Sequence, residues 1–302
     1  MKIRTLVKDF AKFGVPTIIT TLLSIFVIPI IAWVYPADEY GKINLFCSTG
    51  TMLCSLCLLG LDNAYLRFYH DYKENKDKYS LFKYALFSGI LISLLLFSIV
   101  SLFIRDEISN YLFGETAYWL LFILTMYVIA SISLRMTSLS SRLETDAKLF
   151  GYQQVANVLI SKVIFVAVAI FTTRYTVTVT VITICLCCAS FFFLIRTSRE
   201  RLKKPLVLPL KCERKKYILY ALPIMPSTLM LYANSLCAKY ILGCYGDYST
   251  IGILAMATSF AHIFAIITNL FTSYWSVFVF KNYEKENKLI KDIQHIVTML
   301  PY

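Results

Sequence analysis

Long apolar runs separated by short charged segments dominate this chain. About 20 apolar residues are enough to cross the hydrocarbon core of a bilayer, and on that basis the pattern predicts about eight membrane-spanning helices. The predicted spans lie near residues 11–34, 41–63, 82–104, 117–138, 151–173, 175–195, 217–243 and 250–275. The turn between the fifth and sixth spans is so short that these two helices form an antiparallel hairpin. The fold class expected is an all-α polytopic membrane protein.

Composition places the chain in the same class. Of its 302 residues, 58% are hydrophobic and 16% are charged, which lies outside the usual range of soluble domains. A net charge of +12 is also typical of proteins that bind nucleic acid. Here, however, the basic residues fall in short loops between apolar runs rather than on one face of a domain, so no nucleic-acid partner is expected.

The distribution of Lys and Arg predicts the orientation in the membrane. The segment 196–216 alone holds nine Lys or Arg residues against two Glu, a net charge of +7. If the N-terminus is cytoplasmic, the cytoplasmic segments together hold 25 Lys and Arg residues and the outer segments hold three. Because cytoplasmic loops carry the excess of basic residues, this bias predicts a cytoplasmic N-terminus.

An internal repeat is indicated by three matches at nearly constant offsets of 207, 211 and 212 residues. The matches pair Pro16 with Pro223, Gly41 with Gly252, and FYHDYKENK at 68–76 with FKNYEKENK at 280–288. Each match is weak alone, but the three occur in the same order along a helical hairpin. Spans seven and eight therefore read as a second copy of spans one and two, in the same orientation.

The repeat divides the chain into three parts. Residues 1–195 form a first six-helix transmembrane bundle, 196–216 a basic cytoplasmic linker, and 217–302 the first part of a second, incomplete bundle. Parallel repeats about an axis along the membrane normal are a transporter architecture. Because the chain stops where a ninth span begins, we expect a truncated sequence or a natural short form.

Several segments resemble the polysaccharide flippases of bacterial O-antigen and capsule synthesis, in the superfamily that also holds multidrug and toxic-compound extrusion transporters. The resemblance rests on FAKFGVPTII, YPADEYGKINLF, LLGLDNAYLRFYHDY, YALPIMPSTL and SYWSVFVFKNYEKENK. It implies two six-helix bundles around a central cavity, and translocation of undecaprenyl-pyrophosphate-linked oligosaccharides across the bacterial inner membrane by alternating access. The implied partners are the bilayer, the lipid-linked oligosaccharide and a polysaccharide polymerase. The chain departs from many relatives in carrying Ala238-Lys239 where they have an Asp-Arg pair.

Lys162 is the first candidate for a contact with an anionic substrate. It lies about 16 Å along the fifth span, too deep for its stem to reach water. An intramembrane cation is costly and marks a functional site by default, although a structural pairing within the bundle also fits. Gln153, Gln154, Asn157 and Ser161 share one arc of the same helix. Lys162 lies about 80° beyond the edge of that arc.

Three other basic residues are candidates with an ordinary alternative. Lys239 lies about one turn from the outer end of span seven, where a ligand contact and a plain interfacial anchor are both consistent with the sequence. Arg67 and Arg135 lie at the inner ends of spans two and four, where topology charges are common. Asp62 precedes Arg67 by five residues, which is less favourable for a direct pair than three or four.

Neutral polar stripes indicate a hydrated lumen or, alternatively, polar packing between helices. They comprise Thr17, Thr20, Thr21 and Ser24 in span one, Asn44, Ser48, Thr51 and Ser55 in span two, and Ser259, His262 and Asn269 in span eight. Asn44, Asn157 and His262 are the candidates for contacts with sugar hydroxyls. Prolines in spans one and seven, Pro223 and Pro226 among them, are expected to bend or break their helices.

Missing features narrow the function further. No carboxylate lies in the middle of a predicted span, there is no phosphate-binding loop of the Gly-x-x-x-x-Gly-Lys type, and the nine cysteines lack metal spacing and read as small buried hydrophobes. We therefore expect neither an enzyme nor a bound cofactor or metal. The alternatives left open are a cation-coupled small-molecule exporter, a membrane-embedded glycosyltransferase or polymerase, and an inactive fragment.

Overall fold

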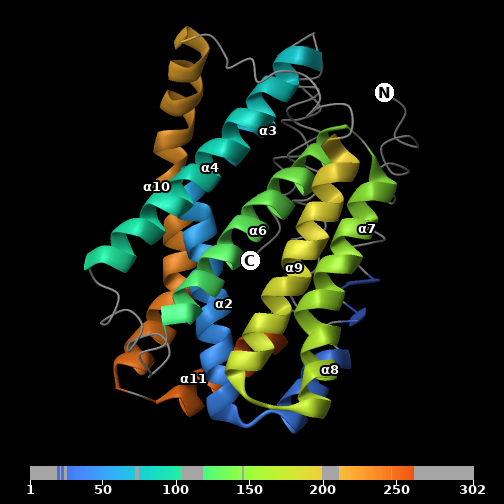
Figure 1. The fold of residues 1–302 in the computed structure, drawn as a ribbon, viewed down its shortest axis with the longest axis vertical. Helices are drawn as coiled ribbons and strands as arrows, with labels where there is room; N and C mark the ends of the chain where they lie inside the picture. The colour runs from blue at the N-terminus through green and yellow to red at the C-terminus, as the bar shows by residue number, and fades with distance from the viewer. Residues whose placement is uncertain are drawn as a thin grey trace, which may run out of the picture.

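The described part of the chain is a bundle of helices joined by short connections and contains no strand (Figure 1). The computed structural model describes residues 19–20, 22–23, 26–71, 75–103, 118–144, 146–198, 211–245 and 247–261. The helices are α2 (Ala37–Leu58), α3 (Leu61–Phe68), α4 (Asn75–Phe103), α6 (Tyr118–Leu143), α7 (Ala147–Val158), η1 (Leu159–Val163), α8 (Ile164–Phe171), α9 (Tyr175–Ser198), α10 (Lys211–Cys244) and α11 (Tyr248–Ala261). Residues 26–34, ahead of α2, are also helical. The fold is therefore all-α, as predicted.

Four stretches of the described residues are long and apolar enough to cross a membrane. They are Tyr79–Phe103, Tyr118–Leu143, Lys148–Phe171 and Tyr175–Thr197, with bounds close to those predicted for spans three to six. The bent pair of α2 and α3 makes a fifth if it is counted as one span. Spans one and eight lie partly outside the described residues. Helix α10, which contains predicted span seven, is long enough to cross a membrane but is not among these stretches. Its Tyr, Pro, Ser and Asn residues lower its hydropathy.

The second predicted span is not a straight helix. Helices α2 and α3 meet at an angle of 56°, and the break lies at Leu59 and Gly60, whose φ angles are 49° and 76°. Glycine suits this left-handed conformation because it has no Cβ. It also allows close approach, because a Cβ on Gly60 would lie 2.7 Å from the carbonyl oxygen of Ala221 in α10. The expectation of one continuous helix over 41–63 is wrong, since Gly60 turns the chain against α10.

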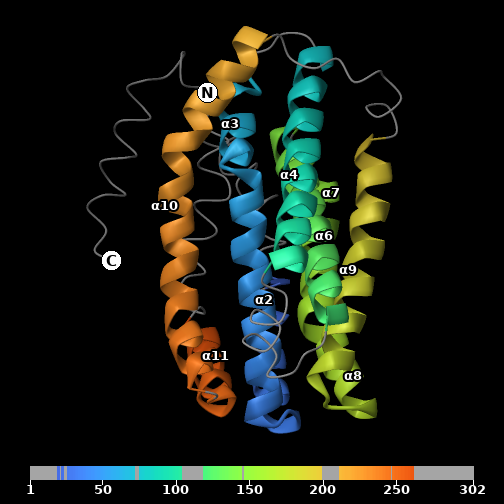
Figure 2. The ribbon, with the colours of Figure 1, turned by 60° about the vertical axis from the view of Figure 1, so that its left-hand side comes forward.

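Two other spans show local features of interest. Helices α7 and α8 form one span through η1, a π-helical turn that contains Lys162. Helix α10 stays continuous for 34 residues although Pro223 and Pro226 lie inside it, so the prolines do not break it (Figure 2). The N-terminus of α7 is capped by Asp146, whose carboxylate accepts a hydrogen bond from the Leu149 amide at 3.1 Å.

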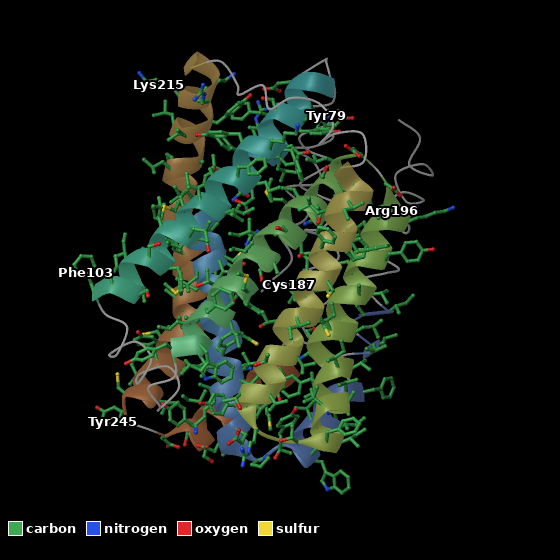
Figure 3. All side chains as sticks on the ribbon, in the orientation of Figure 1. Tyr79, Phe103, Cys187, Arg196, Lys215 and Tyr245 are labelled. Carbon is green, nitrogen blue, oxygen red and sulfur yellow. The ribbon has the colours of Figure 1, made fainter. Side chains whose placement is uncertain are left out.

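The two ends of the bundle can be told apart by their residues. Figure 3 places Tyr79, Arg196 and Lys215 at one end and Tyr245 at the other. Arg196 and Lys215 belong to the basic segment 196–216, and we call their end the basic end and the other the opposite end. At the basic end, Phe68 of α3 packs against Tyr217 and Tyr220 of α10, at ring-centroid distances of 5.2 and 5.3 Å.

At the opposite end, side chains of α2 contact α9 and α11. Glu39 accepts a hydrogen bond from the backbone amide of Tyr175. The ammonium group of Lys42 lies over the rings of Tyr175 and Tyr248, at 5.2 and 5.1 Å from their centroids. Nearby, Asp247 caps α11 by accepting a hydrogen bond from Thr250, and this bonding holds the pKa of Asp247 below its ordinary value. These contacts tie the two predicted repeats together at this end.

The cysteines are less uniformly buried than expected. Cys54 and Cys57 are buried in the bundle, whereas Cys188, Cys237 and Cys244 are exposed on its surface. All eight cysteines whose side chains the structure describes are free thiols. The expectation of burial inside the protein is therefore wrong for these three.

Candidate substrate-binding site inside the bundle

The polar stripe predicted on span two lies along one face of α2. A buried cation from α10 contacts the part of this stripe that lies nearer the opposite end. Lys239 of α10 is 9% exposed, and its Nζ donates a hydrogen bond to Ser48 Oγ at 2.8 Å. Ser48 Oγ donates in turn to Asn44 Oδ1 at 3.4 Å. Lys239 therefore points inward toward α2 rather than out to the membrane surface. The alternative of an interfacial anchor is wrong for this residue.

Lys162 is a second cation within the membrane-spanning helices, and its side chain is partly exposed. Lys239, by contrast, is buried against Ser48. Within the described ranges, neither ammonium group has a carboxylate within ion-pair distance. Lys162 lies in the π-helical turn η1, and such turns in helices are frequent at functional sites. Two cations without a carboxylate partner among the described residues therefore lie within the bundle, Lys239 beside α2 and Lys162 on η1.

Arg135 of α6 is the third cation, and it lies deeper than a topology charge would. Its Nη2 forms an ion pair with Asp62 Oδ2 of α3 at 2.6 Å. Its Nη1 donates to Ser55 Oγ of α2 at 3.0 Å and to the hydroxyl of Tyr232 in the middle of α10 at 3.3 Å. The interpretation of Arg135 as an ordinary charge at the inner end of span four is therefore wrong. Arg135 joins four helices instead.

A polar cavity of about 380 Å³ lies beside Arg135, between α2, α6, α7, η1, α9 and α10. Its lining consists of Thr51, Cys54, Tyr127, Ser131, Leu134, Arg135, Ser138, Gln153, Gln154, Asn157, Ser161, Leu186 and Tyr232. The arc predicted on span five thus lines one cavity, together with Thr51 of the α2 stripe. Lys162 is not part of this lining, which agrees with its position beyond the arc.

Gln153 is the most unusual member of the lining. It is 4% exposed, and neither its Nε2 nor its Oε1 has a hydrogen-bond partner. Buried polar side-chain atoms nearly always have a partner, so an amide with both atoms unpaired needs an explanation. Its neighbours on the same helix, Gln154 and Asn157, also line the cavity. Both amide atoms lack accessible surface, so the amide lies buried in the cavity wall rather than open to the cavity.

Two of the predicted site residues are not brought into this group. Arg67 forms an ion pair with Asp71 at 3.2 Å, four residues on, and both side chains are partly exposed. It behaves as an ordinary charge at the end of α3. His262 lies outside the described residues, as does Asn269 of the same predicted stripe, while Ser259 bonds to the backbone carbonyl of Ala255 at 2.7 Å. Thr20 is buried, and the rest of its stripe lies outside the described residues.

Sequence reasoning missed the pairing of Asp62 with Arg135 and the role of Tyr232. The two partners of the ion pair are separated by 73 residues, and nothing local links them. The one feature of the sequence that could have indicated this ion pair is Asp62 itself, a carboxylate close to the Leu59-Gly60 pair at which the helix breaks. A carboxylate placed there is buried at 6% exposure, and a buried charge needs a partner.

A second cavity, of about 450 Å³, lies between α2, α4, α6 and α10. Its lining is almost entirely apolar and includes Met52, Leu96, Phe97 and Leu236. It lies on another face of α2 from the polar cavity. The two cavities differ in chemistry, because one is lined by amides and hydroxyls and the other by hydrocarbon.

The comparisons with known proteins agree with a membrane bundle of this kind. Residues 6–279 match the family described as polysaccharide biosynthesis protein. The chain belongs to this family. Members of the polysaccharide biosynthesis family are generally transporters rather than enzymes, and the apolar helices place this member in a membrane. Comparison with curated proteins and with solved structures gives no significant match.

Proposed function

We propose that this member of the polysaccharide biosynthesis family flips undecaprenyl-pyrophosphate-linked oligosaccharides across the bacterial inner membrane, with its N-terminus in the cytoplasm, for O-antigen or capsule assembly. One observation carries the proposal. Lys239 donates a hydrogen bond to Ser48 of α2, Lys162 lies in η1, and neither has a carboxylate partner among the described residues. Buried positive charge without a counter-ion is unfavourable, so an anionic ligand is the group that completes the site.

The other parts of a lipid-linked sugar also have matching surfaces. The polar cavity begins about one turn of α2 from Ser48, the residue that Lys239 contacts, and its amides and hydroxyls suit the hydroxyl groups of a glycan. The apolar cavity next to α4 and α10 suits an isoprenoid chain. A diphosphate, a glycan and a hydrocarbon chain are the three chemical parts of the proposed substrate.

Two alternatives from the sequence receive less support. A cation-coupled exporter needs a buried acidic site, but the buried carboxylate of Asp62 is already paired with Arg135 at 2.6 Å. A membrane glycosyltransferase or polymerase needs charged catalytic residues outside the membrane. The described connections at the opposite end, such as 172–174, are too short to hold such a site.

The proposal can be tested by translocation in vesicles. The purified chain is reconstituted with an undecaprenyl-diphosphate-linked oligosaccharide, and the transfer of the sugar across the membrane is followed by its accessibility to a membrane-impermeant oxidant. We expect Lys239→Met and Lys162→Met each to lower the initial rate at least about tenfold, because each removes one uncompensated charge. Lys239→Arg is expected to keep most of the rate.

Arg174→Met is the matched control, because Arg174 is an exposed cation in the turn before α9. It should leave the rate within about twofold of the unmodified chain. Equal rates for all four variants would contradict the assignment of Lys162 and Lys239 as contacts with the diphosphate. Absence of any transfer by the unmodified chain, when it is correctly inserted, would contradict the proposed function itself.

A further inference from the structure

The surface of α10 near the basic end combines positive charge with exposed hydrocarbon. An open cavity of about 380 Å³ lies against this surface. At about 100° per residue, its described lining covers an arc of about 140° on one face of the helix. The lining comprises Arg214, Lys215, Ile218, Leu219 and Leu222. A ligand that complements this face has an anionic group and an apolar chain.

The apolar part of this face is open to the surroundings of the protein. Helix α10 stands at one edge of the bundle (Figure 2), and the side chains of Ile218, Leu219 and Leu222 are all exposed. A contiguous apolar patch on a protein surface marks a place of contact with another molecule or with a membrane. Because the chain lies in a membrane, these three side chains contact acyl chains.

The length of α10 places the cations and the apolar residues at different depths. Its 34 residues span about 51 Å, whereas the hydrocarbon core of a bilayer is about 30 Å thick. With α10 centred in the core, Lys215 lies about 19 Å from the midplane, at the level of the lipid headgroups. Leu222 then lies about 8 Å from the midplane, among the acyl chains. Charge and hydrocarbon follow the order in which a phospholipid presents them.

Two neighbouring lysines differ in their relation to this face. Lys215 lines the cavity, is exposed at the basic end (Figure 3) and forms no ion pair within the described ranges. Lys216 lies outside the arc, and its ammonium group is over the ring of Phe68 in α3, 4.9 Å from the centroid. The two residues carry the same charge one position apart, but only Lys215 belongs to the cavity.

We propose that this face of α10 binds one anionic phospholipid of the bilayer. Its phosphate lies against Lys215 and Arg214, and one acyl chain runs along the apolar residues of the arc. The two cations favour an anionic headgroup over a zwitterionic one, because a zwitterionic headgroup has no net charge. The face shares no lining residue with the polar cavity. Its ligand is therefore a lipid of the membrane rather than the translocated substrate, and the site does not depend on the proposed function.

Native mass spectrometry of the purified full chain in detergent tests the proposal. The chain is titrated with phosphatidylglycerol and with phosphatidylcholine of the same acyl chains, and the dissociation constants of the first bound lipid are compared. One Lys or Arg near a membrane surface strengthens binding of anionic lipid about fivefold, so the unmodified chain should bind phosphatidylglycerol at least about tenfold more tightly. Lys215→Gln should weaken phosphatidylglycerol binding about fivefold and leave phosphatidylcholine binding within about twofold.

Lys216→Gln is the matched control, because it removes the same charge at the neighbouring position. Both lysine side chains are exposed, so neither change disturbs a buried contact. The control should keep phosphatidylglycerol binding within about twofold of the unmodified chain. Equal weakening by the two changes would show attraction to overall charge only, and would overturn the proposal. Equal binding of the two lipids by the unmodified chain would also overturn it.

Two further probes identify the occupant of this face. Glycerol phosphate has the charged group without acyl chains, and it should not displace phosphatidylglycerol at an equal concentration, because it lacks the apolar contact. Undecaprenyl diphosphate should bind equally well to the unmodified chain and to Lys215→Gln. Displacement by glycerol phosphate would show an anion site only, and weaker binding of undecaprenyl diphosphate to Lys215→Gln would show a site for the translocated lipid. Either result, or a dimer of the chain that excludes the bound lipid, would overturn the proposal.

Discussion

The two ends of α2 are held in opposite ways. At the opposite end, α2 and α11 meet backbone to backbone, because a Cβ on Gly41 would clash with the carbonyl oxygen of Tyr248 and a Cβ on Gly252 with that of Ala37. Toward the basic end, α2 itself is held by side chains, through Ser55 and Arg135 beside a polar cavity, and the backbone approaches α10 closely only after its last residue, at Gly60. Close backbone packing allows one arrangement, whereas a hydrogen-bonded network can exchange partners with a ligand.

The α2–α11 contact also bears on the predicted repeat. Ala37 and Tyr248 are 211 residues apart, as are Gly41 and Gly252. Gly41 contacts Tyr248, and Gly252 contacts Ala37. The predicted repeat therefore converts one of these contacts into the other. Reciprocal contacts of this kind are what two copies of one unit make about a two-fold axis. If the repeat is correct, its two copies meet here through equivalent contacts.

The largest effect is expected from Gly41→Leu, which would break the backbone contact. The new side chain would meet the carbonyl of Tyr248, which belongs to the backbone of α11 and cannot move aside. We expect a loss of about 3 kcal/mol or more in stability, measured by thermal unfolding of the purified chain in detergent.

Gly89→Ala is the control for this prediction. A Cβ there would lie 3.3 Å from side-chain atoms of Ile132 and Leu58, which can shift by a few tenths of an ångström. We expect a change below about 1 kcal/mol. If Gly41→Leu is tolerated equally well, the α2–α11 crossing is not the close contact described above.

A smaller effect is expected from Asp62→Asn, which tests the side-chain network. It leaves Arg135 with hydroxyl partners only and thus removes the counter-charge of a largely buried cation. Losing one partner of a fully buried pair costs about 3–5 kcal/mol. Because the Arg135 side chain is 33% exposed, we expect a loss of about 2 kcal/mol in thermal unfolding.

The double variant Asp62→Asn with Arg135→Gln sharpens this test. Because it removes the unpaired cation as well, it should be less destabilised than the sum of the two single variants. Strict additivity would show that the ion pair contributes no coupling energy, and the network toward the basic end would then be held by its hydroxyl contacts alone.

The smallest effect is expected from Arg67→Ala, at the end of α3. The pair with Asp71 joins two partly exposed side chains on the surface. Such pairs contribute about 0–1 kcal/mol, so stability should change by less than about 1 kcal/mol and the translocation rate by less than about twofold. A tenfold loss of the translocation rate would show instead that Arg67 contacts the substrate.

Much of the architecture follows from local pattern. Spans three to six were predicted within a few residues, because a run of apolar residues with few charges has no stable place outside an apolar environment. The hairpin turn before Tyr175 and the arc of Gln153, Gln154, Asn157 and Ser161 also follow from spacing, since side chains three and four residues apart share one face of a helix.

The site itself depends on contacts that no local pattern contains. The break at Gly60, the pairing of Asp62 with Arg135 and the inward direction of Lys239 each join segments far apart in the chain. Lys239 illustrates the reason. Near the end of α10, its side chain can reach either the membrane surface or a neighbouring helix. Only the packing of α10 against α2 directs it to Ser48.

The sequence by itself therefore determined which segments are apolar helices and which faces of them are polar. Hydrophobic burial and helical periodicity act over a few turns, so both can be read along the chain. Only the tertiary structure decided which polar groups meet, which charges cancel and that the Gln153 amide is buried without a partner. Those outcomes depend on how helices cross, and a crossing is set by side-chain shape and close approach at contacts such as Gly60 against Ala221.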